Sequence, residues 1–311
     1  MKNILSLDGG GIRTYIPLRI LNEIEIRTGK HPSEIFDYFT GVSAGSLITN
    51  LLLLKNKDGK PKYDTFQILD IFIESSSKIF YYTYYDLLSS GFGIFKPLYS
   101  LNNVIKTITE RFGKNKFKDL LKPSCVITYD MLNSEACYFN TLENLDMYVA
   151  DSIIASASAP TYFEPYKVIL NEKQRIFIDG GMVTNNPVEI CFLKASEYYP
   201  NDNFYTLSLG TGYNNLKNLK NYGLYDWSKS ILNVLFSANA DFQSNELSFI
   251  DKLLPNNLFD RINVEIPEYI PLDDLKSFKM LKVIMDDWIK NNGDKIDDLC
   301  NKLKGKMPSS K

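Results

Sequence analysis

Histidine is almost missing from this chain, with His31 the single copy among 311 residues. A serine hydrolase of the α/β-hydrolase type carries its catalytic histidine after the serine and the acid in chain order. No histidine follows residue 31, and His31 itself lies in a Gly-Lys-His-Pro-Ser stretch that is typical of a helix end followed by a turn at the surface. We therefore expect His31 to have no catalytic role, so that any nucleophilic serine must use another base.

Cysteine is also scarce, and its copies are scattered. There is no C-x-x-C pair and no cysteine–histidine cluster among Cys125, Cys137, Cys191 and Cys300. This spacing argues against a structural zinc site and against a disulfide framework, and it favours a reducing compartment. No acidic loop suited to calcium is apparent either, so we expect neither a metal nor another cofactor.

The chain lacks an excess of either charge and lacks a long apolar run. Its formal net charge of −2 offers no basic surface for nucleic acid, and we expect no nucleic-acid binding. The apolar run 47–54 is interrupted by Thr49 and Asn50, and residues 1–8 are too short in apolar run for a signal peptide. We expect a cytoplasmic protein that contacts membranes at most peripherally and transiently.

The sequence Gly41-Val42-Ser43-Ala44-Gly45 lies between two apolar runs. The run 35–40 predicts a short buried strand, and the run 47–54 predicts a helix packed on a sheet. Glycines permit a tight strand-to-helix turn, and a serine on such a turn presents its hydroxyl at a helix N-terminus. Ser43 is therefore either a nucleophile or a simple N-cap, and five positions alone do not decide between the two.

Three consecutive glycines follow the first predicted strand, residues 4–7, and precede a helix predicted over 15–28. Such a loop gathers backbone N–H groups that bind anions. A dinucleotide loop would need a glycine where Thr14 stands and an acidic residue about 20 positions later, and a Walker loop would need Gly-Lys-Ser/Thr. The loop Asp8 to Thr14 is thus either a glycine turn after a strand or an oxyanion hole.

Asp179 follows another predicted strand, 175–178, and precedes Gly180-Gly181. A helix is predicted to start at Asn185-Asn186-Pro187, with asparagine as cap and proline in the first turn. In open α/β sheets, functional sites form at the carboxyl ends of strands. The alternative is an Asp-Gly turn in which the carboxylate only bonds local N–H groups.

Eight aromatic residues fall between positions 80 and 99. They either fill core around neighbouring helices or form a glycine-punctuated cap that lines an acyl pocket or touches a lipid interface. Elsewhere the pattern predicts helices over 64–80, 98–112, 147–158, 227–250, 272–291 and 295–304, and strands over 124–130, 135–139, 204–209 and 259–264. A polar loop at 213–222 suggests a catalytic core over 1–215, with 216–311 a helical part completing the same domain.

Taken together and in this order, three segments resemble the patatin-like phospholipases: Asp8-Gly9-Gly10-Gly11-Ile12-Arg13, Gly41 to Gly45, and Asp179-Gly180-Gly181. Residues 157–163, 185–187 and 208–212 also look like family segments, and the resemblance covers about 3–212. It implies an α/β protein with a three-layer α/β/α fold and a mostly parallel central sheet.

The resemblance also implies hydrolysis of acyl esters, in phospholipids or other acyl-ester lipids, by a Ser–Asp dyad. By this resemblance Ser43 is the nucleophile, Asp179 the base, and the glycine loop Gly9, Gly10 and Gly11 the oxyanion hole. The motif glycines are Gly41, Gly45, Gly180 and Gly181. The chain departs from the family at Thr14 and Ser46, where glycines are usual or frequent, and these departures put loop geometry in doubt more than chemistry.

Arg13 remains open between two roles. It either complements a lipid phosphate or orients the glycine loop, or it is a surface arginine at a helix N-terminus. Two rival functions also remain. One is a membrane-degrading effector of the same chemistry that a signalling nucleotide activates, and the other is a non-catalytic lipid-binding protein.

Overall fold

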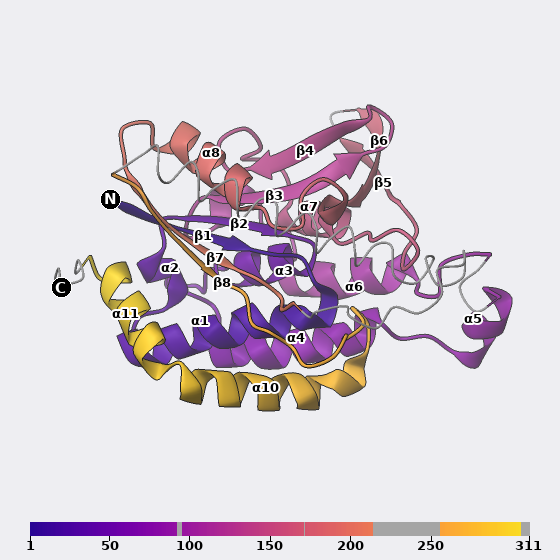
Figure 1. The fold of residues 1–311 in the computed structure, drawn as a ribbon. Coiled ribbons are helices and arrows are strands. Elements are labelled where there is room, and N and C mark those ends of the chain that lie inside the picture. The colour runs from indigo at the N-terminus through magenta and orange to yellow at the C-terminus, as the bar shows by residue number, and fades with distance from the viewer. Residues whose placement is uncertain (92–94, 171, 214–255, 306–311) are drawn as a thin grey trace.

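A sheet of eight strands forms the centre of the protein, whose computed structural model describes residues 1–91, 95–170, 172–213 and 256–305 (Figure 1). The strand order is β5-β6-β3-β2-β1-β7-β8, with β4 beside β3. Strands β3, β2, β1, β7 and β8 run parallel, and β4, β5 and β6 are antiparallel additions. The strands are β1 (Lys2–Leu7), β2 (Tyr38–Val42), β3 (Ser124–Asp130), β4 (Glu135–Asn140), β5 (Tyr166–Leu170), β6 (Lys173–Asp179), β7 (Phe204–Leu209) and β8 (Leu258–Ile262).

Helices cover both faces of this sheet. They are α1 (Tyr15–Thr28), α2 (Pro32–Ile35), α3 (Ala44–Leu51), α4 (Thr65–Ile79), α5 (Tyr84–Ser89), α6 (Leu101–Phe112), α7 (Val149–Ser156), α8 (Val188–Tyr198), α10 (Phe278–Asn291) and α11 (Gly293–Leu303). Short 3-10 turns occupy Gly11–Thr14, Phe117–Asp119, Gly180–Met182 and Leu275–Ser277. Within the described residues, no helix has the length and apolar character needed to span a membrane.

Successive side chains along a strand point to opposite faces of the sheet, so the hydrophobic core has two parts. In β1, Ile4 belongs to a small cluster with Cys191 and Phe204 beneath α8, whereas Leu5 and Leu7 belong to the large cluster on the opposite face. Among the helices that the structure describes, Figure 1 shows α8 on one side of the sheet and α1, α3, α4 and α10 on the other. A parallel sheet that is buried on both faces needs such apolar residues at successive positions. The predicted three-layer α/β/α fold is confirmed.

Two predicted boundaries and the predicted surface position of His31 are wrong. Residues 35–37 do not belong to a strand, because His31 and Glu34 form a capping box that starts the short helix α2. His31 is also buried rather than at the surface, with 6% of its area exposed, and this burial lowers the pKa of its imidazole. The second boundary is at residue 272, where a helix was predicted but α10 begins only at Phe278.

The predicted helix does not start at residue 272, because Leu272 contacts the glycine loop, and residues 275–277 form a 3-10 turn before α10. The carbonyl of Leu272 accepts a hydrogen bond of 2.8 Å from the N–H of Ile12, so it cannot serve a helix of its own. The predicted helix over 227–250 lies outside the described residues. Strand β8 pairs with β7, and α10 and α11 pack on α1. The division into a core over 1–215 and a helical part over 216–311 stays a prediction.

An ion pair between distant parts of the chain ties β8 to the end of β1. Arg261 Nη1 lies 2.8 Å from Oδ1 of Asp8, and Arg261 Nη2 lies 2.5 Å from Oδ2. Asp8 is 2% exposed, and Arg261 Nη1 also donates to Ser208 Oγ over 2.7 Å. A buried carboxylate is tolerated when it is paired and hydrogen-bonded in this two-pronged way.

We predict that Arg261→Met lowers the free energy of unfolding by about 3–5 kcal/mol, because it leaves the buried Asp8 carboxylate without its cation. The matched control is Lys302→Met, which removes a partly exposed ion pair with Asp260 on the same strand and costs under about 1 kcal/mol. Urea unfolding of both variants measures the difference. Equal losses in the two variants would contradict a special role for the Asp8–Arg261 pair.

Candidate active site

Ser43 stands on a sharp turn between β2 and α3. Its backbone has φ 53° and ψ −129°, a left-handed conformation that is strained for a residue with a side chain. The turn is possible because Gly41 and Gly45 lie against each other: a Cβ on Gly41 would come within 2.5 Å of the Gly45 carbonyl. A Cβ on Gly45 would in turn lie 2.6 Å from the carbonyls of both Leu7 and Asp8. These contacts explain why both motif glycines are needed.

Two other serines hold the backbone of Ser43. The N–H of Ser43 donates to Ser156 Oγ over 2.8 Å, and that hydroxyl donates to the Ile127 carbonyl over 2.6 Å. The Ser46 hydroxyl donates to the Ser43 carbonyl over 2.6 Å, so the departure from glycine at this position adds a support to the turn. Sequence reasoning missed Ser156, which it placed inside the helix predicted over 147–158 without assigning it a role.

The strand register brings Asp179 to the level of Ser43. Val42 pairs with Ile127 across β2 and β3, and the next residue of β3, Thr128, pairs with Asp179 on β6. Asp179 ends its strand as predicted, but β6 runs antiparallel to β3. Its position beside Ser43 therefore comes from pairing with the end of β3, and not from the rule that applies to parallel strands.

The Asp179 carboxylate is fully buried, and its two oxygens differ. Oδ1 accepts a 2.7 Å hydrogen bond from the N–H of Gly181, whereas Oδ2 has no hydrogen-bond partner in the described part of the chain. Burial raises the pKa of Asp179 from about 3.8 to about 6, against the opposing effects of the Ser43 hydroxyl and the Gly181 N–H. Near neutral pH, Oδ2 is thus a buried acceptor with an unused lone pair close to Ser43.

The glycine loop passes directly over Ser43. A Cβ on Gly9 would lie 3.1 Å from Ser43 Cβ and 2.6 Å from Asn185 Oδ1, so no larger residue fits. Its carbonyl is held by Asn185 Nδ2 at 3.1 Å and by Thr211 Oγ1 at 3.0 Å. Asn185 therefore anchors this loop, whereas the predicted capping of α8 falls to Asn186, whose Oδ1 accepts from the N–H of Val188 over 3.3 Å.

The backbone of Gly11 is packed closely against the segment that contains Leu272. Gly11 has φ +53°, and a Cβ there would lie 2.2 Å from the Leu272 carbonyl. The N–H groups of Gly10 and Gly11 have no hydrogen-bond acceptor among residues 1–91, 95–170, 172–213 and 256–305. Two unused donors on a rigid loop next to a serine hydroxyl are suited to binding an oxyanion.

The three predicted loops meet at one cavity of about 60 Å³. Its polar end is formed by Ser43, Asp179, Gly10 and Gly11. The rest of its wall is almost entirely apolar and comes from α3, α4, α6, α7 and the loops after them: Ala44, Leu47, Phe72, Ser76, Ile79, Phe80, Val104, Ile108, Ile153, Ala157, Ala159, Tyr162, Phe163 and Leu272. An apolar cavity with a hydroxyl and a carboxylate in its wall is suited to the hydrocarbon of an acyl chain whose ester lies at the polar residues.

Arg13 is 5% exposed, so the alternative of a surface arginine is wrong. Burial lowers the pKa of its guanidinium, while Tyr269, Tyr162 and Asp8 raise it. Its Nε has no hydrogen-bond partner in the described part of the chain. The neighbouring Thr14, the other departure from the family, is fully buried, and its hydroxyl likewise lacks a partner there.

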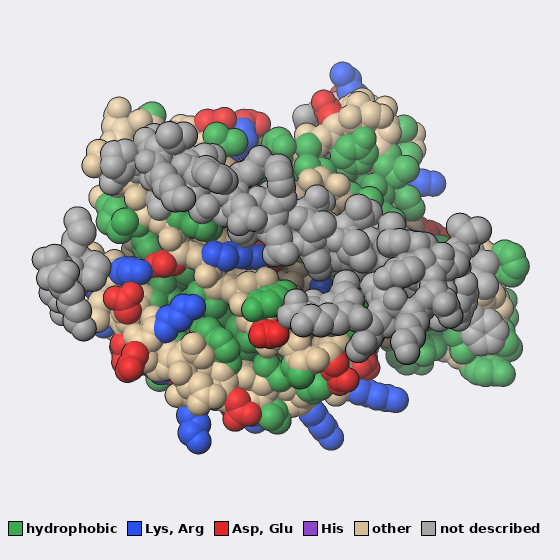
Figure 2. Space-filling view, in the orientation of Figure 1, with side chains coloured by type: hydrophobic (Ala, Val, Ile, Leu, Met, Phe, Trp, Pro, Cys, Tyr) green, Lys and Arg blue, Asp and Glu red, His purple; other side chains and the backbone are tan. Residues whose placement is uncertain are grey.

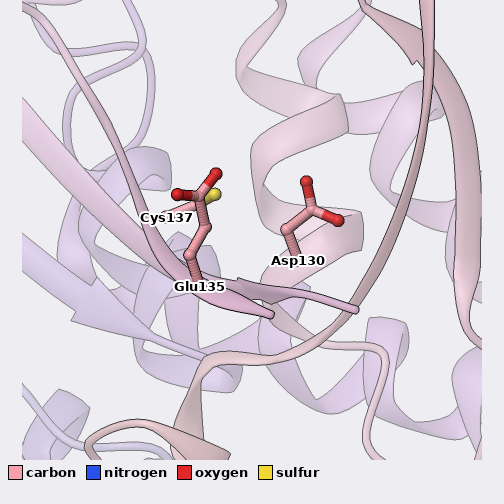
Figure 3. Close-up of side chains that lie close together, drawn as sticks. All are labelled: Asp130, Glu135 and Cys137. Carbon is pink, nitrogen blue, oxygen red and sulfur yellow. The ribbon is translucent and has the colours of Figure 1, made fainter. Parts of the chain in front are cut away.

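A second group of titratable side chains lies away from this cavity, where β3 turns into β4 (Figure 3). Possible ligand atoms of Asp130, Glu135 and Cys137 lie within 4.8 Å of one another. Asp130, however, already pairs with Arg175 Nη1 at 2.5 Å and accepts from the N–H of Leu132 at 2.9 Å. Burial raises the pKa of Cys137 to about 11, which keeps the thiol neutral. These features favour an ion-paired hairpin end over a metal site.

Known proteins resemble this chain along most of its length. A sequence model of the family described as Patatin-like phospholipase matches residues 5–192. Patatin-like protein 4 of Arabidopsis thaliana is 28% identical over 96% of this chain and 84% of its own length, and patatin-like protein 2 of the same plant is 30% identical over 82% and 73%.

A bacterial relative and a solved structure also match. A cGAMP-activated phospholipase of Escherichia coli (strain TW11681) is 28% identical over 67% of this chain and 61% of its own length. Among solved structures, VipD from Legionella pneumophila matches 92% of this chain and 67% of that chain with a TM-score of 0.40 and 13% identity. The resemblance inferred from the motifs is confirmed by the family match.

We predict that Asp179→Asn is more stable than the wild type at pH 7, by roughly 3 kcal/mol, because a buried charge is replaced by a neutral amide. The pKa of Asp179 in the folded protein, about 6, lies above its unfolded value. The wild type therefore loses stability as the pH rises from about 4 through 6, and the variant does not.

Denaturant unfolding at several pH values measures this difference, and Asp58→Asn in an exposed loop is the matched control. Parallel stability curves for the wild type and Asp179→Asn would contradict a raised pKa at this carboxyl.

Proposed function

This chain belongs to the patatin-like phospholipase family, and on that premise we propose that it is a phospholipase A-type lipid acyl hydrolase acting through Ser43 and Asp179. Family membership implies lipid acyl hydrolysis and a lipid substrate. One observation carries the assignment of residues. A buried carboxylate with one oxygen unpartnered shares an apolar cavity with a serine on a strained turn.

In the proposed reaction, Asp179 Oδ2 accepts the proton of Ser43 as Oγ attacks the ester carbonyl carbon. The tetrahedral oxyanion is stabilised by N–H groups of the loop Gly9, Gly10 and Gly11, and the unused donors of the last two support this role. The alcohol then leaves with the proton from Asp179, and the acyl group stays on Ser43. Water, deprotonated by Asp179, attacks the acyl-enzyme and releases the fatty acid.

Substrate binding follows from the same cavity. Its apolar wall holds one acyl chain, and the narrow volume favours a single extended chain over a bulky group. Arg13 is proposed to complement the lipid phosphate, because it is a buried cation with no carboxylate within ion-pair distance in the described part of the chain, and it lies near Tyr162 of the cavity wall. The alternative role for Arg13, orientation of the glycine loop, predicts a different mutant phenotype.

Two rival functions are tested with the same protein. The E. coli relative is a cGAMP-activated phospholipase, so ester hydrolysis measured with and without cyclic dinucleotides tests whether this chain needs such an activator. A fluorophosphonate probe tests the non-catalytic alternative, which requires that Ser43 fail to react with it.

We predict that Ser43→Ala and Asp179→Asn each reduce hydrolysis of a short-chain ester by roughly 10³-fold or more, because each removes a group that acts on the reacting atoms. The matched control is His31→Ala, which removes the lone histidine and leaves the activity unchanged. Full activity in either of the first two variants would refute the dyad.

The pH dependence of the wild type supplies an independent check on the base. Activity rises with pH through about 6, where Asp179 loses its proton. A profile that is flat between pH 5 and pH 7 would exclude this carboxyl as the base.

We predict that Arg13→Met lowers kcat/KM on a phospholipid by about tenfold or more, since a charge-assisted contact with the phosphate is lost. Hydrolysis of an uncharged short-chain ester changes much less, and Arg13→Lys recovers part of the phospholipid activity. Equal losses on both substrates would instead indicate that Arg13 orients the glycine loop.

A further inference from the structure

We propose that the segment around α5, described at residues 81–91 and 95, is a docking surface for a zwitterionic phospholipid bilayer, which it brings to the mouth of the Ser43 cavity. This inference rests on the proposed function, because it supplies the route by which a membrane lipid reaches that cavity. The segment is called the α5 surface below. It is defined by six large side chains: Tyr81, Tyr82, Tyr84, Tyr85, Leu88 and Phe95.

The α5 surface exposes hydrophobic area that no part of the described chain covers. Helix α5 has no buried residue, and the side chains of Tyr84 and Tyr85 are each 75% exposed. Leu88 is 52% exposed and Phe95 is 85% exposed. In Figure 1, α5 projects from the body at the end opposite the two termini, and in Figure 2 hydrophobic side chains are visible at the edge of this end. A concentrated apolar patch on a projecting element indicates a binding surface.

The α5 surface is connected to the cavity through a series of contacting aromatic rings. Tyr82 contacts Tyr99 with ring centroids 5.7 Å apart, and Tyr99 contacts Phe80 at 5.3 Å and Phe163 at 6.0 Å. Phe80 and Phe163 line the cavity that contains Ser43. Tyr99 is fixed in this path by a 2.6 Å hydrogen bond from its hydroxyl to Asp273 Oδ2. An acyl chain that leaves a bilayer at α5 thus meets aromatic surface along its way to the nucleophile.

The chemistry of the α5 surface selects a bilayer of neutral headgroups. Four of its six side chains are tyrosines, whose apolar rings and polar hydroxyls suit the boundary between acyl chains and headgroups. Residues 80–100 contain a single acidic residue, Asp86, and a single basic residue, Lys96. With no excess positive charge, this surface gains nothing from anionic lipids, and its binding energy comes from burying rings and Leu88.

The test uses the full chain in a Ser43→Ala background, so that the vesicles stay intact, and measures co-sedimentation with extruded phosphatidylcholine vesicles. Replacing Tyr84, Tyr85 and Leu88 together by serine is expected to lower the vesicle partition coefficient about tenfold or more. The control replaces two exposed hydrophobics elsewhere, Phe66 (57% exposed) at the far end of α4 and Val283 (61% exposed) on α10, by serine and leaves partitioning unchanged. Raising the salt concentration from about 0.05 to 0.5 M changes the wild-type partitioning less than about twofold.

Several outcomes would overturn the proposal. These are unchanged partitioning of the triple variant, binding that requires anionic lipid and is lost in salt, or a patch that instead joins two copies of the chain in sedimentation analysis. In the catalytically intact protein, the triple variant is expected to keep its rate on a soluble ester and to lose rate only on vesicles. Absence of soluble esterase activity in the wild type would contradict the proposed function, whereas vesicle binding is still judged by co-sedimentation.

Discussion

The site depends on one close contact between backbones, where the first turn of α3 is pressed against the carboxyl ends of β1 and β2. Gly45 lies against the carbonyls of Leu7 and Asp8, and Gly41 lies against Gly45. A side chain at either glycine would push the helix away from the sheet. The strained conformation of Ser43 follows from this contact, because the chain must turn from β2 into α3 within one residue. The Gly9 loop is then held at van der Waals distance from the serine.

Two buried carboxylates near this contact have opposite electrostatic environments. Asp8 is neutralised by the two-pronged guanidinium of Arg261, and it serves to fix the start of the glycine loop. Asp179 receives one N–H bond and no cation within ion-pair distance in the described part of the chain, so burial raises its pKa to about 6. The first arrangement favours stability, and the second keeps a proton acceptor close to physiological pH at the expense of stability. The contrast distinguishes the structural carboxylate from the proposed base better than their motifs do, since each is followed directly by glycines.

Much of the fold and the positions of the loops could be predicted from the local sequence. Strand 4–7, helix 15–28 and the loops at Gly9 to Gly11, Ser43 and Asp179 were predictable, because each depends on hydrophobic periodicity or on glycines beside a strand end. The residues that hold these loops in place could not be predicted from the sequence. Arg261 lies 253 positions from Asp8 in the sequence, and Ser156 reaches Ser43 only through the packing of α7 on β3.

One signal for the first of these supports was present in the sequence. The strand predicted over 259–264 carries Asp260 and Arg261 side by side, and a charged residue that a sheet buries needs a partner, but the sequence does not say which one. Residues 272–277 illustrate the opposite error. Their apolar pattern fits a helix, yet the hydrogen bond from the N–H of Ile12 to the Leu272 carbonyl takes precedence. Non-local partners therefore decided both cases.

The aromatic segment 80–99 combines the two alternatives that the sequence left open. Phe80 and Tyr99 are packed against Phe163 at the cavity, whereas the side chains of α5 are exposed. A core segment would bury its rings, and an ordinary surface helix would carry charges, so neither alternative alone explains a graded exposure along one short stretch. The change from buried rings at the cavity to exposed rings at α5 fits the proposed bilayer docking. An acyl chain that moves between the bilayer and Ser43 would then remain in contact with apolar side chains. The preference for tyrosine at the exposed end fits this explanation, since a hydroxyl limits how deeply each ring enters the acyl region.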